Sequence, residues 1–244
     1  MSTKKISEVL SGNRYPGRII IIGKTFDGKV AIAYAIMGRS ENSRNRIFKI
    51  EGERDVYTKA FDESKVSDPS LIIYSAVRYV DGGIIVTNGD QTDTVRDGLA
   101  EGRSFSEALS TRTFEPDAPN YTPRISGLVT YADGDFDYQM SILRCPSGDG
   151  VTCSRDFYKY KGECGVGHII HTYASDGDPL PSFVGEPIPI EIPQNVEEFT
   201  HQIWDSLDRE NRISLYTMTL DIKTNEFRPC IINKNDASDM TALR

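Results

Sequence analysis

The sequence predicts a single α+β domain over residues 1–244, built from antiparallel hairpins with helices packed on the sheet faces. Three observations lead to this fold class. Apolar runs occur in pairs around short glycine-containing turns, helical spacing is confined to a few segments, and no repeat of solenoid length is present. Hydrophobic residues make up 38% of the chain and charged residues 26%, which is the balance of an ordinary globular protein.

The first four predicted strands form two hairpins. Residues 18–25 (RIIIIGKT) and 30–38 (VAIAYAIMG) are joined by FDGK, whose Asp-Gly pair is a strong turn signal. Residues 71–80 (LIIYSAVRYV) and 83–89 (GIIVTNG) meet in the same way around DGG. Each hairpin therefore places two apolar strands side by side in a sheet.

Helical character appears in three places. Residues 92–102 and 104–112 are predicted helices, and Ser104 and Glu107 have the spacing of a capping box. Asn195 marks the start of a third helix, whose apolar residues lie on one face. These helices can cover sheet faces but cannot form a core alone.

The remaining predicted strands are residues 125–132, 136–145, 166–173, 213–222 and 227–233. A proline-rich crossover precedes the last helix, and its five prolines favour an extended chain there. The segment 146–165 is rich in glycine, serine and charged residues, so we expect it to lie on the surface.

Charge is distributed unevenly along the chain. The formal net charge is -8, yet residues 1–61 hold 12 Lys and Arg against 6 Asp and Glu. Three of these arginines lie in the stretch GRSENSRNR, residues 38–46, and the alternative is that they pair with nearby glutamates on a solvated loop. An acidic protein with a compact arginine cluster suits one small phosphate or carboxylate better than nucleic acid, so no nucleic-acid partner is expected.

Membrane and export signals are not expected in this sequence. The start lacks the apolar stretch of a signal peptide, and the longest aliphatic run, Ile19–Ile22, is far too short to span a bilayer. The sequence therefore predicts a cytoplasmic protein with no membrane partner.

A metal site has weak support. His168 and His171 form an HxxH pattern with Cys164 four residues upstream of His168, and together they offer three metal ligands. In a strand, however, residues three apart point to opposite faces. The four cysteines form no CxxC pair, so we expect neither a metal nor a disulfide framework.

Several polar residues stand at distinctive spacings in three segments. These are YPGRIIIIGKT with AYAIMGRSENSRNR, then IIYSAVRYVDGGIIVTNGDQTDTV, and then FEPDAPNYTPRISG. Together they resemble the archaeal-type IMP cyclohydrolase family and its bacterial relatives. The likeness runs in order from Tyr15 to about Tyr131 and beyond that becomes general.

The resemblance implies a four-layer αββα sandwich of antiparallel sheets, like that of the N-terminal-nucleophile hydrolases but without their chemistry. It implies dehydrative closure of 5-formamidoimidazole-4-carboxamide ribotide to IMP, a step of purine biosynthesis. That reaction requires no metal, cofactor or covalent nucleophile, and the sequence has no Walker loop, GxGxxG after a strand, or GxSxG. The implied partner is a small purine ribotide, and a homo-oligomer is left open.

The resemblance also implies the site residues. Arg46, Tyr74 and Glu115 are at the positions expected for catalysis: Tyr74 as a donor to an oxygen, and Glu115 as a general acid or base. Arg18 and Arg39 join Arg46 as candidates for the ribotide phosphate, because guanidinium groups make bidentate contacts with phosphate. Without the resemblance, Tyr74 is equally well explained as a sheet aromatic and Glu115 as a solvated carboxylate.

A second polar group follows a predicted strand in TNGDQTDT, residues 87–94. Asn88, Thr92 and Asp93 are expected to contact the base or the ribose hydroxyls, although a plain turn with a helix cap explains the same residues. Arg124, in YTPRIS, leads into a strand and is also expected to point into the site.

Departures from the archaeal pattern leave alternatives open. Residues 1–14 form an N-terminal extension, the loop between Arg39 and Arg46 is longer, and 146–165 is a surface insertion relative to the family. The chain could therefore act on a related ribotide. Two other classes remain: a non-catalytic purine-nucleotide-binding protein, and an amidohydrolase of the N-terminal-nucleophile type that would use Ser2.

Overall fold

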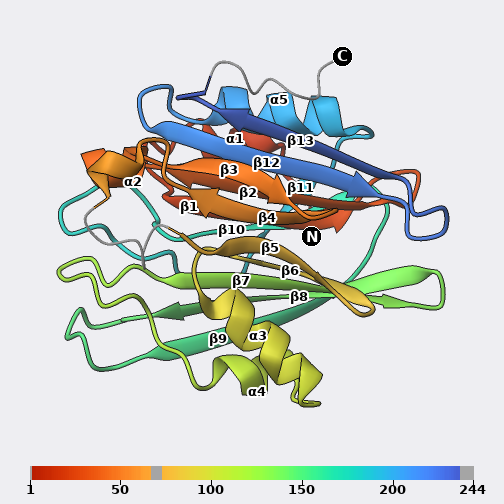
Figure 1. The fold of residues 1–244 in the computed structure, drawn as a ribbon, viewed down its shortest axis with the longest axis horizontal. Coiled ribbons are helices and arrows are strands. Elements are labelled where there is room, and N and C mark those ends of the chain that lie inside the picture. Colours follow the sequence, from red (N-terminus) through yellow and green to blue (C-terminus); the bar gives the residue numbers. More distant parts are fainter. Residues whose placement is uncertain (1, 67–72, 237–244) are drawn as a thin grey trace.

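Two antiparallel sheets face each other across a shared core, and helices lie against their outer faces (Figure 1). The computed structural model describes residues 2–66 and 73–236. The predicted α+β class with antiparallel sheets is confirmed. Of the predicted strand 71–80, the first two residues lie outside the described residues.

Sheet A has six strands in the order β11-β10-β1-β2-β12-β13. They are β1 Arg18–Lys24, β2 Val30–Met37, β10 Val166–His171, β11 Ile188–Glu191, β12 Arg212–Leu220 and β13 Phe227–Asn233. The central pair, β1 and β2, is buried on both faces, which is why its sequence is a nearly continuous apolar run.

Sheet B has seven strands that follow one another in chain order. They are β3 Ile47–Glu51, β4 Asp55–Lys59, β5 Ser75–Val80, β6 Gly83–Thr87, β7 Arg124–Ala132, β8 Asp135–Arg144 and β9 Ser154–Lys161. Within the predicted insertion 146–165, β9 pairs with β8 along its whole length. Its side chains alternate between half-buried and exposed, as at a sheet edge.

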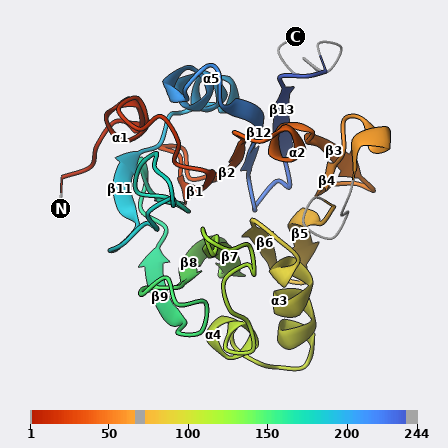
Figure 2. The same cartoon turned by 90° about the vertical axis from the view of Figure 1, so that its left-hand side faces the viewer.

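The helices cover opposite sides of the two sheets (Figure 2). They are α1 Ile6–Leu10, α2 Glu41–Arg44, α3 Gln91–Ala100, α4 Phe105–Leu109 and α5 Val196–Ser206, with a 3-10 turn at Glu63–Lys65. Helices α1 and α5 pack on sheet A, whereas α3 and α4 pack on sheet B. No helix in the described ranges is both long enough and apolar enough to cross a membrane.

Local signals in the sequence explain where these helices begin. The predicted capping box is confirmed, because the Ser104 hydroxyl accepts from the Glu107 amide and the Glu107 side chain accepts from the Ser104 amide. The predicted cap at Asn195 is confirmed in the same way, through the amide of Glu198. The segment predicted as an N-terminal extension supplies α1, whose Ile6 and Leu10 are buried with α5.

The core between the sheets depends on one close approach. A Cβ atom at Gly127 of β7 would lie 2.4 Å from the Cδ1 of Ile22 in β1. Only glycine leaves room for the Ile22 side chain there, so the facing strands can pack directly. Aliphatic and aromatic side chains of both sheets fill the rest of this core.

Candidate active site

Buried polar side chains from both sheets gather around Arg18 and Arg46. Arg18 begins β1, and Arg46 directly precedes β3; only 8% and 6% of their surfaces are exposed. Each interacts electrostatically with Tyr34, Tyr74 and Glu115. The structure therefore brings together four residues predicted from sequence, Arg18, Arg46, Tyr74 and Glu115, and adds Tyr34.

The two guanidinium groups form no ion pair with a carboxylate in the described part of the chain, although both interact with Glu115 at longer range. Within residues 2–66 and 73–236, neither arginine forms an ion pair, and the Nε atom of each has no hydrogen-bond partner. Arg18 donates only a long bond, 3.4 Å, from Nη1 to the carbonyl of Met37. Burial and the charge of Arg18 lower the pKa of Arg46, although a guanidinium still stays protonated at neutral pH. Two buried guanidinium groups side by side lower the stability of the folded protein unless an anion or an oxygen-rich ligand binds to them.

Backbone contacts hold Arg46 in place between the two sheets. Its carbonyl accepts a hydrogen bond from the Ser214 hydroxyl of β12, at 3.2 Å. The preceding side chain, Asn45, exchanges two hydrogen bonds with the backbone of Asp62. Arg46 is thus fixed by a polar turn rather than by an ion pair.

Tyr74 stands at the start of β5 with its backbone anchored to β4. Its amide donates to the Thr58 hydroxyl at 3.1 Å, and its carbonyl accepts from the Thr58 amide at 3.0 Å. The Tyr74 hydroxyl lies 2.7 Å from the hydroxyl of Tyr34 in β2. Burial raises the pKa of Tyr34 well above its usual value, so that hydroxyl stays protonated.

Glu115 lies in the loop between α4 and β7. Its amide donates to the carbonyl of Thr122 at 2.9 Å, while the Thr122 hydroxyl and amide both donate to the carboxylate of Asp117. Burial raises the pKa of Glu115, and Asp117 adds to this, while Arg124, Arg18 and Arg46 act in the opposite direction. A buried carboxyl with a raised pKa is a candidate for general acid or base catalysis.

Arg124 is placed beside Glu115 by a network at the start of α3. Its Nη1 donates to Gln91 Oε1 at 2.7 Å and lies 2.7 Å from the carboxylate of Asp90, which also pairs with Arg112. A Cβ atom at Gly89 would lie 2.6 Å from Arg124 Nη1 and 3.6 Å from Glu115 Oε1. A side chain at position 89 would therefore collide with Arg124 and touch Glu115, so glycine leaves room for both functional groups.

The other predicted substrate contacts lie outside this cluster. The Asn88 side chain accepts from the Ile125 and Gln91 nitrogens and donates to the Pro123 carbonyl. The Thr92 hydroxyl bonds to Thr87 and to the Ser75 carbonyl, and Asp93 forms surface ion pairs with Arg78 and Arg96. The structure gives these three side chains scaffold partners, and their contact with a substrate stays a prediction.

Arg39 lies nearer the surface than the other two predicted phosphate ligands. Its guanidinium pairs with Asp176 at 2.6 Å and lies over the ring of Tyr15, with 4.9 Å between the guanidinium carbon and the ring centroid. Tyr15 in turn interacts with Arg18. The arginines therefore form a line from the exposed Arg39, past Tyr15, to the buried Arg18 and Arg46.

The histidines of the HxxH pattern serve two separate contacts. His168 Nδ1 lies 2.6 Å from the Tyr138 hydroxyl, and His171 Nδ1 lies 2.9 Å from the Tyr173 carbonyl. Burial lowers the pKa of each imidazole to about 4. The part of the chain that the structure describes contains no group of three or more His, Cys, Asp or Glu residues that could hold a metal ion.

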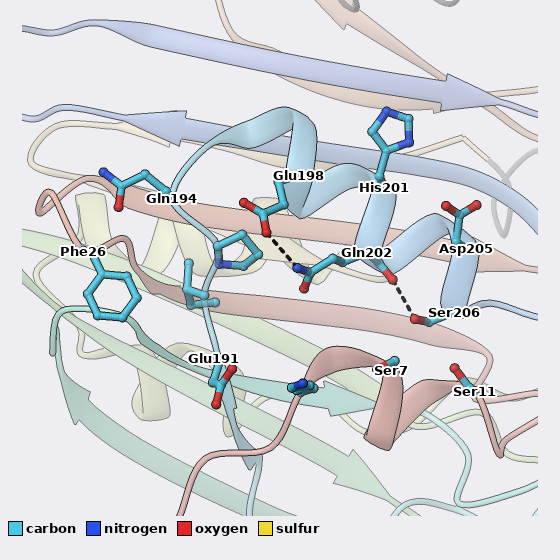
Figure 3. Close-up of a pocket in the computed structure, with 13 residues that line it drawn as sticks. Ser7, Ser11, Phe26, Glu191, Gln194, Glu198, His201, Gln202, Asp205 and Ser206 are labelled. Carbon is cyan, nitrogen blue, oxygen red and sulfur yellow. Dashed lines mark hydrogen bonds between the residues drawn. The ribbon is translucent and has the colours of Figure 1, made fainter.

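Two surface cavities differ in their relation to this cluster. A cavity of about 600 Å³ adjoins Arg124 and is also lined by Arg112, Phe114, Tyr121 and Val151. Another, of about 810 Å³, lies between α1, α5 and the end of β11 (Figure 3). The carboxylates of this second cavity are exposed to solvent, and we place the candidate site at the buried arginine cluster.

Sequence reasoning missed Tyr34, Gln91 and Asp90. Tyr34 lies inside VAIAYAIM, where every residue is buried, so its ring was indistinguishable from the core. One signal in the sequence could have pointed to Tyr34. It carries the single hydroxyl group of an otherwise apolar strand, and a buried hydroxyl requires a hydrogen-bond partner.

Comparison with known proteins identifies the family. A model described as IMP cyclohydrolase-like protein matches residues 15–225. A Methanopyrus kandleri protein named IMP cyclohydrolase is 37% identical over 124 residues, which cover 50% of this chain and 60% of that protein. A Methanococcus maripaludis protein of the same name is 30% identical over 128 residues, covering 51% and 62%. A Methanosphaera stadtmanae protein, also so named, is 31% identical over 119 residues, covering 47% and 57%. The matches thus span about three fifths of each relative.

Proposed function

This chain belongs to the IMP cyclohydrolase-like family, and we propose that it closes the ring of 5-formamidoimidazole-4-carboxamide ribotide to form IMP. The observation that carries the proposal is the pair of buried, unpaired guanidinium groups beside a tyrosine hydroxyl and a carboxyl of raised pKa. These groups match the needs of a reaction that moves protons and places charge on oxygen.

The reaction balances without a redox partner. The carboxamide nitrogen attacks the formyl carbon, forming a C–N bond and turning the formyl oxygen into a hydroxyl. One proton of the carboxamide nitrogen moves to that oxygen. The C–O bond then breaks, the hydroxyl leaves as water with the proton of the formamido nitrogen, and a C=N bond forms. Both reacting groups are on one molecule, so holding them close and coplanar supplies much of the rate.

We assign roles to the clustered residues by their burial. Arg46 and Tyr74, both buried, stabilise the former formyl oxygen, while Glu115 carries the proton between the attacking nitrogen and the leaving hydroxyl. Arg18 and Arg39 hold the 5'-phosphate. A phosphate dianion is strongly hydrated, and it loses less hydration free energy when it binds toward the exposed end of the line of arginines. Asn88, Thr92, Asp93 and Arg124 would surround the base and ribose.

We also propose a fold relationship beyond the α+β sandwich. The order helix, sheet, sheet, helix supports an αββα sandwich similar to that of the N-terminal-nucleophile hydrolases. The amidohydrolase alternative has less support, because Ser2 is exposed and is separated from β1 by α1.

The deciding experiment mixes the protein with the formamido ribotide and follows IMP by its ultraviolet absorbance. We expect turnover above the spontaneous rate without ATP or folate, because the formyl group is already on the substrate. No turnover, combined with tight IMP binding, would instead support a purine-nucleotide-binding protein.

A further inference from the structure

We propose that Tyr34 is a positioning residue for Tyr74: its hydroxyl donates a hydrogen bond to Tyr74 and so directs the Tyr74 proton toward the substrate. The inference rests on the proposed function and adds a residue that the family comparison does not assign. It starts from the 2.7 Å contact between the two hydroxyl oxygens, which alone does not say which one donates.

Tyr34 is held rigidly. Its strand, β2, is paired on both sides, with Ile20 of β1 and Tyr216 of β12 directly opposite Tyr34. Its side chain is fully buried, and its ring packs against Phe48 with 5.4 Å between the ring centroids. Because the ring cannot move, its hydroxyl is a fixed reference point for any group bound to it.

Counting protons gives the direction of the bond. Each hydroxyl has one proton, and the contact between them uses one of the two. If Tyr74 donated, the Tyr34 proton would need another acceptor, and the described residues supply none for this fully buried oxygen. If Tyr34 donates, its proton is satisfied and the Tyr74 proton is free.

The neighbouring arginines favour the same direction. Arg18 and Arg46 interact with both tyrosines, and a guanidinium can only donate. Neither arginine can therefore accept the free proton, which leaves a bound substrate oxygen as the acceptor. A hydroxyl that accepts one hydrogen bond becomes a stronger donor in its next one, so Tyr34 also strengthens the contact from Tyr74 to that oxygen.

The test is steady-state kinetics of Tyr34→Phe on the formamido ribotide. This variant keeps the ring packed on Phe48 and removes only the donor. We expect kcat to fall by about tenfold to a hundredfold, with KM and IMP affinity within about threefold of wild type, because the lost bond acts on the reacting oxygen.

Tyr216→Phe is the matched control. Tyr216 stands directly opposite Tyr34 in the sheet, is equally buried, and interacts with Tyr79 instead of with the Tyr34–Tyr74 pair. We expect its kcat to equal that of wild type. A similar loss in both variants would mean that removing any buried hydroxyl perturbs the sheet, and would overturn the proposal.

A double-mutant cycle separates positioning from general stabilisation. In the Tyr74→Phe background, adding Tyr34→Phe should change kcat by less than about twofold, because the group it orients is gone. Independent, multiplicative losses would overturn the proposal, and so would a wild-type kcat in Tyr34→Phe alone. Should Tyr34→Phe fail to fold, 3-fluorotyrosine can replace Tyr34, because it keeps the shape of the ring and makes the hydroxyl more acidic. A changed kcat with unchanged KM would then support the proposal. An unchanged kcat would overturn it.

The wild-type measurement in the same experiment distinguishes the two proposals. Absence of turnover in wild type removes the proposed function and, with it, the role of Tyr34. Turnover in wild type with no selective effect of Tyr34→Phe removes the role of Tyr34 alone.

Discussion

The hydroxyl groups of Thr122 and Tyr173 lie 2.6 Å apart and connect the loop that carries Glu115 to the end of sheet A. Tyr173 follows β10 and is tied to the start of the chain through the Pro16 carbonyl, which accepts from its amide. Thr122 also accepts from the Glu115 amide. The position of the Glu115 carboxyl therefore depends on a contact between the two sheets.

Thr122→Val should misplace Glu115 without changing the shape of the side chain. It removes the hydroxyl's bonds to Asp117 and Tyr173 and keeps the amide's bond to Asp117, so we expect kcat to fall about tenfold while IMP affinity changes little. Kinetics and calorimetry check this. Thr130→Val, at the far end of β7, is the control, and equal activities of the two variants would contradict the role of Thr122.

The line of arginines predicts that the affinity for a nucleotide depends strongly on its phosphate group. Wild type should bind IMP more tightly than inosine, and Arg18→Ala or Arg39→Ala should weaken IMP binding by about 2 kcal/mol, as expected for a lost charged hydrogen bond. Calorimetric titration with both ligands measures the difference. The exposed Arg228, paired with Glu226, provides the Ala control. Equal affinity for IMP and inosine would exclude a phosphate role.

Without a bound ligand, the Arg46 side chain should lower the stability of the folded protein. It is buried next to Arg18 with an unpaired Nε and no carboxylate partner among the described residues. Arg46→Met replaces the charge with an apolar chain of similar length, so we expect a higher melting temperature together with loss of turnover. Each kcal/mol regained corresponds to roughly 2–4 °C in a domain of this size. A lower melting temperature would show that Arg46 is structurally paired.

The raised pKa of Glu115 predicts that this residue makes the folded protein less stable as pH rises. Burial raises the pKa of its carboxyl in the folded protein, whereas an unfolded glutamate ionises near about 4.3. Above that pH the unfolded state loses its proton first, so the Glu115 contribution to stability falls as pH rises through the native pKa.

Glu115→Gln should therefore melt higher than wild type at pH 7 and match it below about pH 4, where both states are protonated. Its kcat should fall by about 10² to 10⁴, and Tyr74→Phe should show a similar loss, with IMP affinity within roughly tenfold. Thermal melts across pH and steady-state kinetics measure both effects. Glu191→Gln, an exposed carboxylate in the cavity of Figure 3, should change neither.

Treatment with a chelator should leave turnover intact. His168 and His171 bond to Tyr138 and to the Tyr173 backbone, so their Nδ1 atoms are engaged in different parts of the fold. Activity is measured before and after treatment with a chelator and again after zinc is added. Activity that disappears and returns with zinc would contradict this reading.

Strong local signals made much of the fold predictable. The Asp-Gly turns located the hairpins β1–β2 and β5–β6, and capping residues located α4 and α5. Strands β3, β4 and β9 were not predicted. The first two are only five residues long, and β9 is an edge strand in which polar and charged side chains predominate. Their pairing is decided by neighbouring strands, which a local pattern does not contain.

The candidate site was predictable only in part for a similar reason. The family resemblance pointed to Arg18, Arg46, Tyr74 and Glu115, and the structure brings them together. Asn88 and Thr92 carry the same donor and acceptor groups, yet the turn after β6 uses them for its own hydrogen bonds. Sequence alone cannot separate a polar group that serves the fold from one that is left available.

The order of the strands also bears on how the protein emerges during synthesis. Sheet B is a continuous stretch from Ile47 to Lys161, whereas β1 and β2 must wait for β10 and β12 to pair on their two sides. The ribosome therefore completes one sheet well before the other can close over it. Until β12 arrives, Tyr34 has an open strand edge beside it, so the surroundings of Arg18 and Arg46 are complete only when most of the chain has been made.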